Sequence, residues 1–255
     1  MSIINFPRTY PLNEEYESIK QRLFQVLGEC SKDIINFNDS GKNVTFISER
    51  LIPVCSLDRP RVLLLFSNPH PQSIRQGMFL SPSVKGQKSL FWSTMKEAGL
   101  LTIENENLTA KQLADICLNS DYNGPFEFIF YCYYAFPTAY PEDICKIFGK
   151  NYFNQIIEPE AINEFRKTVL ETSAEAVVTF NKGIFNLVSE NKIENYINRL
   201  REGELIQSMI QKIDKNVPIF LTYPTGWRYH KEYSHLRKAS LELIKKAIYT
   251  ISTNN

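Results

Sequence analysis

Four short runs of the chain are mostly apolar, at residues 62–66, 126–136, 176–180 and 217–223. Proline or asparagine follows each run within two residues, and these residues end regular structure. Runs of this length that are apolar on both faces are typical of strands buried in a parallel sheet.

Between and after these runs, apolar residues recur every three or four positions, which predicts helices. One predicted helix spans residues 91–100, with Gly99 near its end. The clearest is the last one, whose apolar positions are Leu236, Ala239, Leu243, Ala247 and Ile251. Strands alternating with helices predict an α/β domain of three layers, α/β/α, around four principal and mainly parallel strands.

The first 60 residues follow a different pattern. Leu23, Val26 and Leu27 have helical spacing, which predicts a helix over residues 14–37, then a polar turn at 38–43 and an extended segment at 44–54. No repeat, flexible linker or block of like charge divides the chain. We therefore predict an amino-terminal addition, residues 1–60, packed on a core domain of residues 61–255.

The amino-acid composition is typical of a folded protein and excludes few classes of function. The chain has 255 residues, of which 43% are hydrophobic, so it is not a disordered protein. No apolar run is long enough to span a bilayer, so no membrane partner is expected. With 29 basic and 28 acidic residues the net charge is +1, which excludes a strongly basic protein overall.

The cysteines and the amino terminus favour a cytoplasmic protein without a cofactor. Five cysteines occur with no Cys-x-x-Cys pair, so the spacing of zinc or iron–sulfur sites is missing and no metal site is predicted. The first twelve residues lack the pattern of a secretory signal. We expect reduced thiols and a cytoplasmic location.

Polar and small residues follow all four predicted strands. Ligands of open parallel sheets bind at the carboxyl ends of the strands, where such loops converge. The sequence therefore predicts a site built from four loops: Ser67-Asn68-Pro69-His70, Phe136-Pro137-Thr138, Asn181-Lys182-Gly183 and Tyr223-Pro224-Thr225-Gly226-Trp227.

The order of these segments resembles the uracil-DNA glycosylase superfamily, and most closely its mismatch-specific uracil/thymine glycosylases. In that family a strand enters a Gly-Ile-Asn-Pro-Gly loop, an Arg-Phe-Trp helix leads to Ala-Gly, and the last strand ends in Asn-Pro-Ser-Gly-Leu before a basic residue. The corresponding segments here are Phe66-Ser67-Asn68-Pro69-His70, Leu90-Phe91-Trp92 with Ala98-Gly99, and Tyr223-Pro224-Thr225-Gly226-Trp227-Arg228. The resemblance covers most of residues 60–251.

The resemblance implies a DNA-repair hydrolase that flips an altered base out of single- or double-stranded DNA and cleaves its N-glycosidic bond. Asn68 then corresponds to the asparagine that positions the hydrolytic water, and Phe79 to the aromatic residue on which the base stacks. Trp227 corresponds to the wedge that fills the gap in the duplex. Around them, Ser67, Pro69, Thr225 and Gly226 complete the substrate-binding loops.

Several positions depart from the family pattern. The glycines that flank the first loop are replaced by Phe66 and His70, which narrows the space for a ligand. Tyr223 stands where the family has His or Asn, so it would donate a hydrogen bond to the leaving base without a positive charge. An asparagine that recognises uracil in other branches aligns with Tyr131 or Cys132, and neither carries an amide.

For three of these residues a structural interpretation competes with the functional one. His70 could supply the basicity that Asn68 lacks, or it could be a turn residue bonded to backbone. Tyr223 and Trp227 could contact the base and the duplex, or they could be part of the core.

Basic residues are concentrated after the last loop. Six lie between residues 228 and 246 against two acidic ones, which fits contact with phosphates but also fits the solvated face of a helix. Arg228 and Lys231, together with Lys182, are the candidate phosphate contacts.

Three functions remain open on sequence grounds. The first is a divergent DNA glycosylase. The second is a nucleic-acid-binding member of the fold with weak or no catalysis. The third is an α/β domain that binds a small nucleotide, against which the absence of a glycine-rich loop after the first strand of the core domain counts.

Overall fold

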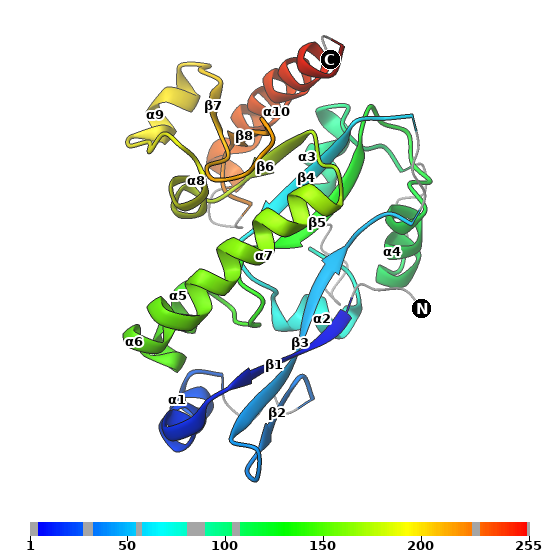
Figure 1. Ribbon diagram of the computed structural model, residues 1–255. Coiled ribbons are helices and arrows are strands. Elements are labelled where there is room, and N and C mark those ends of the chain that lie inside the picture. Colours follow the sequence, from blue (N-terminus) through cyan, green and yellow to red (C-terminus); the bar gives the residue numbers. More distant parts are fainter. Residues whose placement is uncertain are drawn as a thin grey trace.

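The structure is a computed structural model that describes residues 5–27, 33–54, 58–80, 90–103, 108–225 and 230–253. At its centre four strands run parallel, in the spatial order β5-β4-β6-β8 (Figure 1). They are β4 (Arg61–Phe66), β5 (Glu127–Cys132), β6 (Ala176–Thr179) and β8 (Pro218–Leu221). Nearly all their residues are buried, as in strands covered on both faces. The four apolar runs of the sequence thus form the parallel centre of the sheet.

The sheet is mixed and larger than predicted. Counting only described residues it has eight strands, because antiparallel strands extend both edges. The additional strands are β1 (Asn5–Pro11), β2 (Ile35–Asn38), β3 (Asn43–Leu51) and β7 (Ile206–Met209). Their side chains are buried on one face only for much of their length, so they give no continuous apolar run. This is why the sequence predicted four strands.

The predicted helix over residues 14–37 is wrong in its second half. A short 3₁₀ turn, η1 (Asn13–Glu15), leads into α1 (Tyr16–Leu27), but residues 35–38 form β2 and pair with β3. The Phe37 ring packs against Tyr16 from this strand, so its apolar contact does not come from a helix. A few apolar residues at short spacing are compatible with either a helix or a strand.

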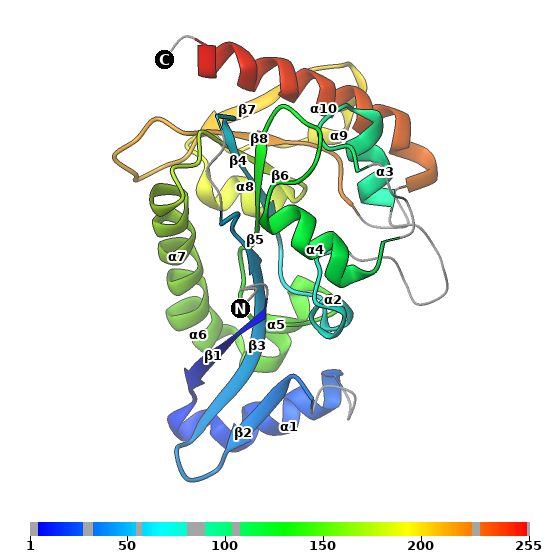
Figure 2. The ribbon, with the colours of Figure 1, turned by 90° about the vertical axis from the view of Figure 1, so that its right-hand side faces the viewer.

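The amino-terminal segment is joined to the main sheet through β3. Figure 2 shows β1, β2 and α1 grouped at one end of the molecule, with β3 leading from them to β5. There Arg50 and Leu51 pair with Tyr131 and Phe130. The first 60 residues therefore contribute a strand to the central sheet as well as a packed helix.

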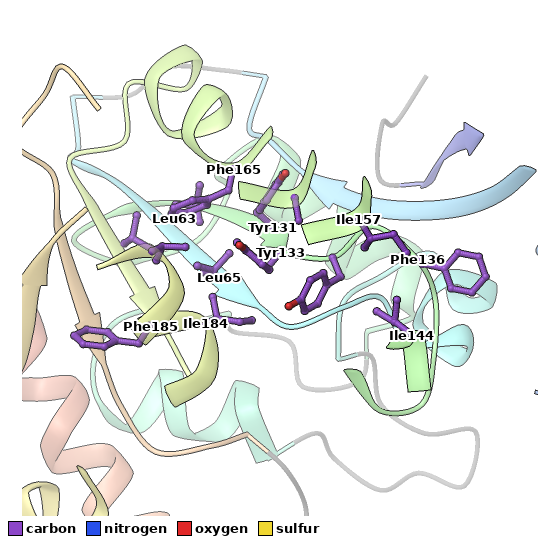
Figure 3. Packing of buried hydrophobic residues seen from close by; sticks show 14 of the residues in the cluster. Leu63, Leu65, Tyr131, Tyr133, Phe136, Ile144, Ile157, Phe165, Ile184 and Phe185 are labelled. Atoms are coloured by element: carbon purple, nitrogen blue, oxygen red, sulfur yellow. The ribbon is translucent and has the colours of Figure 1, made fainter. Parts of the chain in front are cut away.

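Helices cover both faces of the sheet, which gives three layers (Figures 1 and 2). Along β4 the side chains alternate, so that Leu63 and Leu65 enter one core and Val62 and Leu64 the other. The first core, part of which Figure 3 shows, is covered mainly by α1, α5 (Pro141–Phe148), α7 (Glu158–Glu171) and α8 (Lys182–Val188). The second is covered by α3 (Leu90–Glu97), α4 (Ala110–Leu118) and α10 (His230–Thr253).

Short elements complete the connections. They are α2 (Pro71–Gln76), α6 (Lys150–Tyr152), the π-helical turn η3 (Phe153–Ile157) and α9 (Tyr196–Arg201). Gly99 follows α3 with a positive φ of 62°, as its predicted place near the end of that helix requires. Among the described helices, none is both long enough and apolar enough to cross a bilayer.

The most buried positions of the last helix are offset from the predicted ones, although Leu236, Ala247 and Ile251 pack against the two cores. Leu236 and Leu243 are only half-buried and Ala239 is exposed, whereas Leu241 and Ile244 are buried. The buried face also holds Arg237, which is 1% exposed. Its guanidinium donates a hydrogen bond to the carbonyl oxygen of Pro224, so a polar contact connects α10 to the chain after β8. Apolar periodicity alone could not reveal that contact.

Candidate functional site

A cleft of about 890 Å³ opens at the carboxyl ends of the four parallel strands. Residues after every one of these strands line it: Ser67, Asn68 and His70 after β4, residues 138–142 after β5, residues 181–183 after β6, and Pro224 and Thr225 after β8. This is the edge at which ligands of open parallel sheets bind. The structure thus brings the four loops selected from the sequence into one cavity.

Asn68 is held by a fixed set of hydrogen bonds at the base of the first loop. Its amide nitrogen donates to the Thr138 carbonyl oxygen at 2.7 Å and to Thr138 Oγ1 at 2.9 Å. Because a carbonyl oxygen only accepts, these contacts fix which end of the amide faces Thr138. The Thr138 hydroxyl is itself fixed, since it donates to the Tyr140 carbonyl oxygen at 2.8 Å. Among described residues none donates to Asn68 Oδ1, so that oxygen is available to a ligand or a water.

A second amide ties the loop after β6 to the first loop. Asn181 Oδ1 accepts from the Ile184 backbone at 3.1 Å and caps α8, while Asn181 Nδ2 donates to Ser67 Oγ at 2.8 Å. Since Ser67 accepts this bond, its own hydroxyl hydrogen remains free to donate. Side-chain hydrogen bonds therefore hold two walls of the cleft at a fixed separation.

Aromatic rings form the apolar wall. Phe66 stacks on Phe180 with ring centroids 5.5 Å apart and planes 10° apart, and Phe79 lies 5.6 Å from Phe66. All three line the cleft, although Phe79 is largely enclosed by its neighbours. Tyr140 also lines the cleft and is 58% exposed.

His70 lies at the cleft, but its geometry does not suit the role of a base. The Gln72 backbone N–H donates to His70 Nδ1 at 3.2 Å and so caps α2. In a neutral imidazole whose Nδ1 accepts, Nε2 carries the hydrogen, so this ring offers a donor. Desolvation and then the charge of Arg75 lower the pKa of His70, which favours that neutral form. The structural interpretation of His70 as a capping residue is therefore correct, and it leaves one donor in the cleft.

Glu49 of β3 is a cleft residue that the sequence analysis missed. It is 3% exposed, and its Oε2 has no hydrogen-bond partner within the described structure. Burial raises the pKa of this carboxyl to about 8, and the backbone N–H of His70 partly offsets that rise. The sequence could have indicated this position, because residues two apart in a strand point to the same face. Glu49 therefore shares a face with Leu51, which enters the core where β3 joins β5.

Cys132 rather than Tyr131 faces the cleft from β5. Successive side chains of a strand point to opposite faces, and Tyr131 enters the core of the other face, 6.4 Å from the Phe165 ring. Burial and then the Glu49 charge raise the pKa of the Cys132 thiol. Tyr131 is thus placed away from the proposed base-binding position, and Cys132 takes the wall position beside Glu49.

Tyr223 does not reach the cleft either, so the expectation that it faces Asn68 across one cavity is wrong. It is fully buried in the same core as Tyr131, with its ring stacked on Tyr233 at 5.3 Å. Its hydroxyl has no hydrogen-bond partner among described residues, and burial raises the pKa of the phenol. The core interpretation of Tyr223 is correct.

The remaining candidates divide into placed and undescribed residues. Lys182 and Thr225 line the cleft, whereas Pro69 is buried behind it. Gly226, Trp227 and Arg228 lie outside the described residues, and so does the side chain of Lys231. In the described part of the chain no group of three or more His, Cys, Asp or Glu side chains could hold a metal ion.

The sequence was also compared with known proteins. No protein-family model matches it, and neither does any curated protein.

Proposed function

We propose that the protein is a divergent DNA glycosylase, which flips a deaminated or mismatched base out of DNA and hydrolyses its N-glycosidic bond. The observation that carries the proposal is the Asn68 amide, fixed through Thr138 with Oδ1 unoccupied, in a cleft that also has an aromatic wall. In this proposal the sheet is of the uracil-DNA glycosylase type, and DNA with an altered base is the partner.

The size and chemistry of the cleft suit a nucleobase. Its volume of about 890 Å³ lies within the range of small-ligand pockets, about 300–1,000 Å³. Phe66 and Phe180 offer an apolar wall, while the donors of Ser67 and His70 are available to a polar ring. Flipped bases are held by this combination of apolar or aromatic contacts and edge hydrogen bonds.

The proposed reaction does not require a strong general base in the protein. As the bond from C1′ to the base nitrogen breaks, its electron pair leaves with the base and the sugar becomes cation-like. A water that attacks such a cation has to be positioned more than deprotonated. Asn68 Oδ1 accepts a hydrogen bond from that water and aims its oxygen at C1′. Lys182 lines the cleft and would be the contact for a nucleotide phosphate.

The test is cleavage of labelled single- and double-stranded oligonucleotides that carry uracil, hypoxanthine, xanthine or a G·T mismatch, followed by alkali. We expect cutting of at least one substrate, and a loss of about 100-fold in Asn68→Ala because the water is no longer positioned. Asn36→Ala, an exposed amide of β2 remote in sequence from the four cleft loops, is the matched control and should cleave normally. Salt-sensitive binding of these oligonucleotides without cutting would replace the proposal by a non-catalytic nucleic-acid-binding function.

A further inference from the structure

Glu49 is a buried carboxyl without the partners that buried carboxyls normally have. Transfer of an ionised carboxylate into a protein interior is costly unless another group pairs with it. Yet Oε2 has no partner, and no ion pair of the described chain includes Glu49. The neighbouring Arg50 does not help, because its guanidinium lies over the Phe6 ring at 4.7 Å. A group of this kind inside a cleft is available to a ligand.

Burial favours the neutral form of Glu49. The groups beside it are the Cys132 thiol of β5 and the backbone N–H of His70, of which the latter partly offsets the effect of burial. The other ionisable side chains that line the described cleft are those of His70, Tyr140, Glu142, Lys182 and Tyr196. A neutral carboxylic acid differs from a carboxylate because it carries an O–H donor.

We propose that Glu49 donates a hydrogen bond from its carboxylic acid to a carbonyl oxygen of the base in the cleft, and stabilises the negative charge that this oxygen gains as the base leaves. The inference rests on the proposed function and gives Glu49 the task that sequence resemblance gave to Tyr223. It also narrows the substrate class to bases with an exocyclic carbonyl, as deamination produces.

The proposed step is balanced in atoms and protons. The bond between C1′ and the base nitrogen breaks, and its electron pair moves into the base toward the carbonyl oxygen. The Glu49 O–H donates to that oxygen, and the water adds to C1′ as hydroxyl. The proton released by the water passes through solvent to the departing base, and Glu49 keeps its own proton, so the products are the free base and an abasic sugar. Neither oxidant nor metal is consumed.

Other residues of the cleft fit this task less well. The Cys132 thiol is only a weak donor. The His70 donor is fixed at the start of α2 by the cap that its Nδ1 accepts. Of the described residues that line the cleft, Glu49 combines a buried place, an unpaired oxygen and an acidic hydrogen.

The experiment measures single-turnover cleavage between pH 5 and pH 9 for the wild type, Glu49→Gln, Glu49→Ala and Glu190→Gln. The wild-type rate should fall as the pH rises through about 8, where Glu49 ionises. Glu49→Ala should lose at least about 100-fold, the typical cost of one donor to a developing anion. Glu49→Gln keeps an N–H donor at every pH, so it should retain more of the rate and lose this pH dependence. Glu190→Gln removes an exposed carboxylate that does not line the described cleft, and it should keep the wild-type profile.

The outcomes separate the two proposals. Cleavage by Glu49→Gln with the wild-type rate and pH profile overturns the role of Glu49 and leaves the glycosylase function standing. If the wild type cleaves nothing, the function fails, and binding of an uncleavable 2′-fluorinated uracil oligonucleotide decides the rest. Binding by the wild type that Glu49→Ala weakens about 10-fold or more supports recognition of the base by Glu49, whereas equal binding, or none, overturns it.

Discussion

Two buried glutamates mark the two ends of the parallel strands, and their surroundings differ. Glu127 begins β5 and is 0% exposed, but it accepts hydrogen bonds from Arg61 Nε and from Ser120 Oγ, the latter at 3.1 Å. Glu49 lies beside the end of the same strand and is 3% exposed, with one oxygen unpaired. The two carboxyls are almost equally buried, so they differ mainly in their hydrogen-bond partners.

This difference separates a structural charge from a functional one. At the amino end of the strands every polar contact of Glu127 is satisfied within the protein, and Arg61 additionally donates to the Thr172 carbonyl oxygen at 3.2 Å. At the carboxyl end the protein leaves an acid unpaired in a cleft, which costs stability and gains nothing unless a ligand completes it. We therefore expect loss of the Glu127 ion pair to destabilise the protein and replacement of Glu49 to relieve a cost.

The largest effect is expected when Glu127 loses its partner. Arg61→Ala leaves a fully buried carboxylate with only one hydroxyl donor, so we expect the free energy of unfolding at pH 7 to fall by about 4 kcal/mol, measured by urea denaturation. Arg75→Ala is the matched control. It removes an exposed arginine that pairs with Asp33, and it should cost less than about 1 kcal/mol. Equal losses in the two variants would show that Glu127 does not depend on its ion pair.

Glu49 should show the opposite behaviour, because its replacement relieves a cost. A carboxyl whose pKa is about 8 when folded and 4.5 when unfolded binds its proton more tightly in the folded chain. Its stabilising contribution is therefore complete below pH 4.5 and is lost as the pH rises to about 8. Between pH 5 and pH 8 the wild type should lose about 3 kcal/mol of unfolding free energy relative to Glu49→Gln.

Urea denaturation of both proteins at several pH values measures that difference. Because the two proteins differ in one side chain only, the titration of all other groups cancels when the two curves are subtracted. Glu142→Gln, an exposed carboxyl of the same cleft, should stay parallel to the wild type. A Glu49→Gln curve that is also parallel would mean that Glu49 titrates normally, and the contrast with Glu127 would disappear.

The sequence predicted the parts of the fold that are continuous in the chain. The runs that became β4, β5, β6 and β8 are apolar on both faces, so their burial is visible locally. The edge strands depend on pairing with distant partners, as β3 does with β5, and their half-exposed patterns carry little local signal.

The sequence could predict which loops form the candidate site, but not which face of the sheet each side chain enters. Asn68 and Lys182 directly follow central strands, so their place at the carboxyl edge follows from strand order. Tyr131 and Tyr223 were misplaced because neighbouring positions of a strand point to opposite faces, and the sequence does not fix which face each one enters. Glu49 was missed because a lone carboxylate in a strand suggests solvent until its partner strand is known.

The smallest effect is expected for two threonines near the carboxyl ends of the parallel strands. Their substitution tests whether hydrogen-bonded polar groups there stabilise the fold, orient the site, or both. Thr138 accepts from Asn68 and donates to the Tyr140 carbonyl oxygen. Thr179 of β6 is its match, because it accepts from the Asn181 backbone at 3.3 Å and donates to the Leu65 carbonyl oxygen at 3.0 Å. Both are fully buried.

Valine has nearly the shape of threonine but lacks the hydroxyl, so Thr138→Val and Thr179→Val should each reduce the free energy of unfolding by about 1 kcal/mol. Only Thr138→Val also frees the Asn68 amide to turn, and it should slow cleavage about 10-fold more than Thr179→Val does. Urea denaturation and single-turnover cleavage of the two variants measure the two effects separately. Equal cleavage rates would mean that the Thr138 hydroxyl holds the loop but not the amide. The backbone carbonyl oxygens of Thr138 and Pro69, 2.7 Å and 3.1 Å from Asn68 Nδ2, would then suffice to orient Asn68.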